Sequence, residues 1–177
     1  VVYGNAVLRK VAEPITPDYP ELSTLLEDMF KTLKKSEGVG LAAPQIGLPI
    51  QLFIVDLSVM ADDEPSYANF KKVFINPEIL EFSEDTETAE EGCLSIPGVS
   101  EKVKRSLSVT IHYMDENWQE HTETYTGFPA RAIQHEYDHL QGKVFIDRIS
   151  PIRRQLIGSK LTAISKGKIS CRYKYKN

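Results

Sequence analysis

Two histidines and a glutamate in the last third of the chain have the spacing of a metal site. They belong to the segment Gln134-His135-Glu136-Tyr137-Asp138-His139. Residues four apart lie one above the other on a helix, so His135 and His139 can bind one metal ion while Glu136 lies beside it. The alternative, a pair of core histidines, is disfavoured by the glutamate at the second position. The segment therefore predicts an active site.

A buried helix is expected to carry these residues. Pro129 suits its first turn, and Gly142 suits the left-handed residue that ends it. Its residues fall into two stripes, one of Phe128, Ala132, His135, Glu136 and His139, the other of Ile133, Tyr137 and Leu140. A helix that is apolar on two sides is expected to be buried in the core and not to lie at the surface.

A cysteine supplies a third candidate ligand. Cys93 lies in Glu91-Gly92-Cys93-Leu94-Ser95-Ile96-Pro97-Gly98, where Pro97 is expected to end the element. A thiolate and two imidazoles give three protein ligands and leave a fourth position open, as in catalytic rather than structural sites. Taken alone, Cys93 is more typical of a small buried hydrophobe.

A third segment joins glycines to one polar side chain. Gly38-Val39-Gly40-Leu41-Ala42-Ala43-Pro44-Gln45-Ile46-Gly47 follows a helix predicted from the spacing of Leu22, Leu25, Leu26, Met29 and Leu33. Gly38 is the expected end of that helix. The glycines allow close backbone approach, and Gln45 is a polar side chain in an apolar loop. No phosphate-loop pattern is present.

Together the three segments resemble the motifs of the peptide deformylases. They occur in that family's order, and the chain is similar to its members over nearly its whole length. The resemblance implies hydrolysis of the formyl group from the N-terminal formylmethionine of nascent bacterial and organellar proteins, with release of formate. A bound metal ion makes hydroxide available near neutral pH, and Glu136 is expected to move the proton.

The resemblance also implies roles for other residues. The Gln45 side-chain amide and the Leu94 backbone N–H would stabilise the oxyanion. Val39, Gly40 and Gly92 would contact the peptide, with Val39 also lining a methionine pocket. On the helix, Phe128 and Ala132 form the other wall of that pocket or simply belong to the core.

The ligand set does not determine the metal. One thiolate and two imidazoles suit zinc, ferrous iron, nickel or cobalt. The resemblance implies ferrous iron, with zinc a less active occupant. Glu91, Arg105 and Asp138 are candidates for orienting the ligands, or are surface ions.

Composition fits one domain, residues 1–177. The chain is 41% hydrophobic, enough for a sizeable core. No membrane-length apolar run and no signal-peptide pattern are present, so a cytoplasmic bacterial protein is expected. Because the chain does not begin with methionine, an organellar location stays open. With Cys93 as a ligand, Cys171 has no disulfide partner, which fits a reducing compartment.

The remaining pattern predicts an α+β fold of antiparallel strands around the metal-binding helix. Strands are expected over 51–57, 73–80, 103–113 and 119–125, with a surface excursion at 58–72. His112 and His121 are read as surface or cross-strand residues. A further helix is expected at Ser150-Pro151, and alternation around Cys171 predicts a closing strand over 169–175 with Cys171 in the core.

Two other classes of protein stay open. A zinc endopeptidase shares the His-Glu-x-x-His helix but usually takes its third ligand downstream, where this chain offers only Asp147. A metal-dependent binding protein would need neither Glu136 nor Gln45.

Charge is distributed unevenly along the chain. The whole chain is −4, yet residues 148–177 hold nine basic and no acidic side chains, leaving 12 basic and 25 acidic, or −13, in residues 1–147. A basic tail often contacts nucleic acid, here ribosomal RNA rather than DNA. The alternative is a tail that complements the acidic body, and we favour it.

Overall fold

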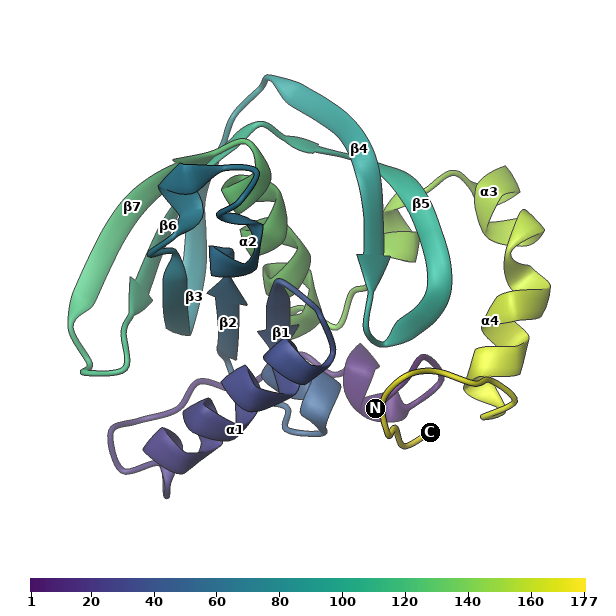
Figure 1. Cartoon of the computed structure of the whole chain (residues 1–177), viewed down its shortest axis with the longest axis horizontal. Coiled ribbons are helices and arrows are strands. Elements are labelled where there is room, and N and C mark those ends of the chain that lie inside the picture. The colour runs from purple at the N-terminus through teal and green to yellow at the C-terminus, as the bar shows by residue number, and fades with distance from the viewer.

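The computed structural model describes residues 1–177 and contains two separate antiparallel sheets with helix α2 between them (Figure 1). The larger sheet has the strand order β1-β2-β3-β6-β7, and the smaller consists of β4 and β5. The strands are β1 (Gly40–Ala42), β2 (Leu52–Asp56), β3 (Lys71–Phe82), β4 (Thr86–Cys93), β5 (Ile96–Ser106), β6 (Ser108–Met114) and β7 (Glu120–Thr126). The helices are α1 (Leu22–Lys35), α2 (Phe128–Leu140), α3 (Pro151–Leu156) and α4 (Gly158–Ser165). The predicted α+β fold in a single domain is confirmed.

Helix α2 is buried as its two stripes predict. Ten of its 13 residues are buried. Pro129 lies in the first turn, and Gly142, just beyond the end, has φ +69°. A β-carbon on Gly142 would also lie 2.6 Å from the Arg9 carbonyl oxygen, so both conformation and space require glycine there.

Three hydrophobic clusters hold the elements together. The first packs α2 against the larger sheet through Phe53, Phe74 and Ile133. The second packs α1 against β2 and β3 through Met29, Leu33 and other residues. The third joins β5, the turn at Phe145–Arg148 and α4. Helix α2 is therefore held by one sheet while its metal-ligand face looks toward the other.

Strand β4 was not predicted, and it carries Cys93 at its end. Its sequence is rich in Glu and Thr and lacks an apolar alternation, because the pair β4 and β5 exposes much of its surface. In the register of this pair, Glu87 lies across from Arg105 and Glu90 across from Lys102, but the Arg105 side chain forms its ion pairs with Glu91 and Asp138. The expectation that Pro97 ends the element is wrong, since it is the second residue of β5.

The predicted strand over 103–113 is two strands that belong to different sheets. The break falls at Leu107, whose N–H donates to the Asp85 carbonyl and whose own carbonyl accepts from the Gly127 N–H. Those two bonds replace a ladder partner and turn the chain from β5 into β6. The hairpin of β6 and β7 is as expected: His112 pairs with Glu120, and His121 with Asp115.

Two details near helix ends differ from the sequence prediction. The left-handed residue after α1 is Glu37 (φ +57°), one position before Gly38. The helix at Ser150-Pro151 forms, with Ser150 Oγ accepting from the Arg153 N–H, but it breaks at Ile157 into α3 and α4.

The predicted closing strand over 169–175 is wrong. The segment forms no strand and pairs with none. Tyrosine hydroxyls hold it instead: Tyr175 donates to the carbonyls of Gly167 and Ile169. Cys171 is half-buried beside a cavity rather than in the core. No helix is long and apolar enough to span a membrane.

Candidate metal centre

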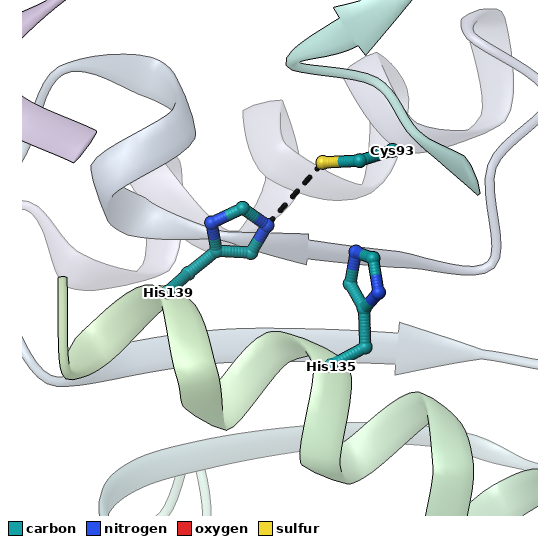
Figure 2. Close-up of side chains that lie close together, drawn as sticks. All are labelled: Cys93, His135 and His139. Atoms are coloured by element: carbon teal, nitrogen blue, oxygen red, sulfur yellow. Dashed lines mark hydrogen bonds between the residues drawn. The ribbon is translucent and has the colours of Figure 1, made fainter. Parts of the chain in front are cut away.

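Cys93, His135 and His139 bring three ligand atoms to one place (Figure 2). One atom from each residue lies within 4.8 Å of the other two, and Cys93 Sγ lies 3.4 Å from His139 Nε2. The two histidines project from successive turns of α2, and Cys93 reaches them from the end of β4. The group predicted from spacing is therefore assembled, and it can hold a metal ion.

The imidazole of His135 is oriented by a carboxylate. Its Nδ1 lies 2.8 Å from Glu91 Oε1, which leaves Nε2 for a metal. Glu91 is itself fixed by two hydrogen bonds of 2.8 Å from Arg105 and one of 2.7 Å from Arg131. The pair of strands that carries Cys93 is thus tied to the helix that carries the histidines.

The ionic cluster continues behind α2. Arg105 Nη1 donates to Asp138 Oδ2 over 2.8 Å, and Arg148 donates to both oxygens of Asp138. Glu91, Arg105 and Asp138 are 7%, 3% and 4% exposed, so the surface-ion alternative is wrong. Arg131 was missed, although its position one helical turn before His135 is a usable signal.

The surroundings favour the thiolate form of Cys93. Burial alone would raise the pKa of this thiol, but the imidazoles of His139 and His135 outweigh it and lower the pKa to about 5. The thiolate is the form that binds metals. Burial would likewise raise the pKa of Glu91, yet hydrogen bonds from Arg105 and His135 lower it to about 2, so this carboxylate is charged at neutral pH.

Glu136 is buried beside the ligand group without a full set of partners. It is 4% exposed, and its Oε2 has no hydrogen-bond partner. Burial raises the pKa of Glu136 to about 7 against the effect of His135 and His139. A buried carboxylate oxygen is normally hydrogen-bonded. An unpartnered one next to a thiol and two imidazoles fits a site that holds a metal ion and water.

The amide of Gln45 is held in a fixed direction. Its Oε1 accepts from the Ala42 N–H over 2.8 Å, which turns Nε2 toward Cys93 Sγ at 3.5 Å and Ser95 Oγ at 3.3 Å. The side chain is 5% exposed. The polar residue that stood out in an apolar loop is therefore a donor aimed at the candidate metal centre.

A cavity of about 640 Å³ opens onto this site. The sequence-predicted residues that line it are Val39, Gly40, Gln45, Gly92, Cys93, Leu94, Phe128, Ala132, His135 and Glu136. His139 lies deeper, at 1% exposure. Phe128 lies at the rim, whereas Ala132 is buried and also belongs to the core cluster of α2. Residues 170–173 of the C-terminal segment line the same cavity, which nothing in the sequence predicted.

The acid downstream of the histidines does not join the site. Asp147 accepts hydrogen bonds from Arg9 and Arg154 and from the Val144 N–H. The third ligand of this centre comes from upstream instead, so the arrangement differs from that expected for a zinc endopeptidase.

Comparisons with known proteins agree with this geometry. The model of the family described as Polypeptide deformylase matches residues 1–155. A peptide deformylase of Christiangramia forsetii is 49% identical over 181 aligned positions, covering 98% of this chain and 92% of that protein. The solved structure of peptide deformylase from Thermotoga maritima superposes with a TM-score of 0.76 at 41% identity, over 85% of this chain and 95% of that one. For a Plasmodium falciparum peptide deformylase the TM-score is 0.85 at 32% identity, over 94% and 95%. The chain therefore belongs to the polypeptide deformylase family, whose members are metallohydrolases acting on formylmethionyl peptides.

Proposed function

We propose that residues 1–177 act as one catalytic domain that hydrolyses the formyl group of N-formylmethionyl nascent peptides in a metal-dependent reaction, releasing formate. One observation carries the proposal: Cys93, His135 and His139 converge within 4.8 Å, beside the buried, unpartnered Oε2 of Glu136. A structural metal site does not require an unpartnered carboxylate beside the ion. A metal-dependent binding protein requires neither Glu136 nor Gln45.

Cys93, His135 and His139 would hold the ion. Their thiolate and imidazole donors suit ferrous iron, zinc, nickel or cobalt, and we propose ferrous iron as the natural one, following the family resemblance. When bound, a divalent ion supplies Lewis-acid activation of water and of the formyl oxygen.

Glu136 is proposed to move the proton. It takes a proton from water as the water oxygen bonds to the formyl carbon, and it delivers that proton to the nitrogen as the carbon–nitrogen bond breaks. The pKa of about 7, raised by burial, suits a group that both accepts and returns a proton near neutral pH. The products are formate and a peptide with a free N-terminal methionine.

Two donors are proposed to stabilise the oxyanion that forms on the former formyl oxygen. They are the side-chain Nε2–H of Gln45 and the backbone N–H of Leu94. The hydrogen bond from Ala42 to Gln45 Oε1 supports this role, because it holds the amide in position before substrate arrives.

The substrate is proposed to lie in the 640 Å³ cavity. The backbone of Val39, Gly40 and Gly92 would contact the peptide. The methionine side chain would pack between Val39 and the α2 residues Phe128 and Ala132, and an unbranched, flexible side chain suits such a pocket.

The proposed setting is the bacterial cytoplasm, where nascent formylated chains are the partners. We also propose, against the interpretation favoured from the sequence, a weak ribosome contact through the lysines of the basic C-terminal segment. Its four arginines are paired with carboxylates, Arg148 with Asp138 and Arg153 with Glu101 among them. Its five lysines are exposed and have no acidic partner, so they are the groups free to meet phosphate: Lys160, Lys166, Lys168, Lys174 and Lys176.

One assay tests the function. The protein is loaded with ferrous iron, cobalt or zinc under anaerobic conditions, and formate release from a short formyl-Met peptide is measured. The acetyl-Met peptide and chelated protein are the controls. Cleavage of internal bonds in an unformylated peptide, without formate release, would replace the proposal with an endopeptidase.

A further inference from the structure

The C-terminal segment closes one side of the cavity that opens onto the metal centre. Ser170, Cys171, Arg172 and Tyr173 line it together with residues of the β4 and β5 pair. The hydroxyl of Tyr173 donates to the Leu94 carbonyl oxygen over 2.5 Å. These residues lie beyond residue 155, where the match to the family's model ends.

The Tyr173 hydrogen bond is the first link of a short chain that ends on a metal ligand. The Leu94 carbonyl and the Ser95 N–H belong to the same peptide group. That N–H donates to Cys93 Sγ over 3.4 Å. The peptide between Leu94 and Ser95 is therefore held at its oxygen by Tyr173 and at its hydrogen by the ligand sulfur.

Contacts on both sides of Tyr173 hold the segment in place without it. The Val2 N–H donates to the Lys176 carbonyl over 3.0 Å, and Tyr175 donates to the Ile169 carbonyl over 2.9 Å. Arg172 pairs with Glu37 at 2.7 Å, although both side chains are largely exposed. Loss of the Tyr173 hydroxyl alone should therefore leave the path of the segment unchanged.

We propose that Tyr173 is a positioning residue of the reaction, which acts by fixing the turn Cys93-Leu94-Ser95. It would do so in two ways, and the second, which concerns the oxyanion donor, rests on the proposed function. Donation to the Leu94 carbonyl polarises the peptide and strengthens the bond from the Ser95 N–H to sulfur, because linked hydrogen bonds reinforce one another. It also fixes the peptide next to the Leu94 N–H, the proposed oxyanion donor.

The test is Tyr173→Phe, which removes only the oxygen. Tyr175→Phe is the matched control, since it removes a tyrosine hydroxyl from the same segment without a contact to the turn. Wild type and both variants are loaded with cobalt, and the thiolate-to-cobalt charge-transfer absorption is recorded. Deformylation is then measured with the formyl-Met peptide.

Tyr173→Phe should shift the charge-transfer band to longer wavelength, because a sulfur that accepts a weaker hydrogen bond gives up electron density more readily. It should lower kcat about tenfold, the lower end of the effect of losing a group that supports a metal ligand, with KM little changed. Because the hydrogen bonds from Val2 to Lys176 and from Tyr173 to Leu94 still hold the segment, Tyr175→Phe should match wild type in both measurements.

Two results would overturn the proposed role of Tyr173, and a third would overturn the proposed function alone. A band and a kcat unchanged in Tyr173→Phe would overturn the role, as would equal changes in both variants, which would assign the effect to the segment's packing. A wild type that binds cobalt through its thiolate but releases no formate would overturn the proposed function instead. The band of Tyr173→Phe would still decide whether the hydroxyl supports Cys93.

Discussion

The side chain of Glu136 occupies the space that a β-carbon on Gly40 would need. Such an atom would lie 2.4 Å from Glu136 Oε1 and 2.8 Å from both Cγ and Cδ, so the whole side chain, not only its tip, would have to move. Gly40 was expected to serve the peptide substrate through its backbone. In the structure it also makes room for the proposed proton carrier.

Gly40→Ala should therefore lower kcat about 10²-fold, the loss expected when acid–base catalysis fails, while metal content stays at the wild-type level. Elemental analysis and formate release measure the two effects. Gly158→Ala is the control, because nothing lies within 4 Å of a β-carbon there and activity should be unchanged. Full activity in Gly40→Ala would show that Glu136 need not stay where it lies.

Glu136→Gln should keep the fold and the metal while activity falls at least about 10²-fold. The amide has the size of the carboxylate but cannot accept the proton from water. Undiminished turnover in a metal-replete variant would mean that another group moves the proton.

Cys93→Ala should lower metal occupancy and abolish deformylation, because one of three ligands and its negative charge are lost. Cys171→Ala is the control: Cys171 lines the same cavity but is not one of the three converging residues. It should bind a full complement of metal. A fully metallated and active Cys93→Ala would contradict the three-ligand arrangement.

Asp147→Asn should reduce stability in a pH-dependent way. Burial would raise the pKa of Asp147, but hydrogen bonds from Arg9 and Val144 outweigh it and hold the pKa below its ordinary value of 3.8. A lowered pKa means that the stabilisation is present above about pH 3.8 and is lost as pH falls through the folded-state value. Urea unfolding should show a loss of about 1–2 kcal/mol at pH 7, from hydrogen bonds to a charged group, and the curves should converge as pH falls below 3.8. Asp28→Asn, an exposed residue 4.0 Å from Lys31, should change little at either pH.

Ribosome co-sedimentation should depend on the exposed lysines of the C-terminal segment. Changing Lys160, Lys166, Lys168 and Lys174 to Ser should abolish binding at low salt, and wild-type binding should fall steeply with salt as counterions are released. Arg153 is kept, because it covers the buried carboxylate of Glu101. The control changes four exposed lysines elsewhere, Lys10, Lys34, Lys35 and Lys143, to Ser. Salt-insensitive binding, or binding that survives the first set of changes, would remove the segment from the interaction.

The sequence was most informative where the site depends on local spacing. His135, Glu136 and His139 follow from one helical repeat, and the residues that bound the helix are local too. Cys93 required an argument from ligand number, since nothing local places it near α2. The roles of Glu91 and Arg105 were left undecided, because their burial arises from contacts between β4, β5 and α2 that lie far apart in the chain.

What could not be predicted depends on partners distant in sequence. Strand β4 lacks an apolar alternation and is a strand only because β5 pairs with it. Residues 169–175 alternate as a strand would, yet they find no partner strand and instead place Tyr173 on Leu94. Alternation of apolar and polar residues shows only that a segment could be a strand, whereas pairing with a neighbouring strand determines whether it becomes one.

Because Cys93 and the two histidines come from separate bodies, the β4 and β5 pair and helix α2, the ligand group exists only after long-range docking has finished. The hairpin and the helix can each form early from local contacts, whereas their meeting must wait for closure of the chain between them. An unfolded or half-folded chain therefore offers at most a partial set of ligands. Tight metal occupancy should arise late in folding, and a chain that retains the ion under competition from a chelator is one that has completed its fold.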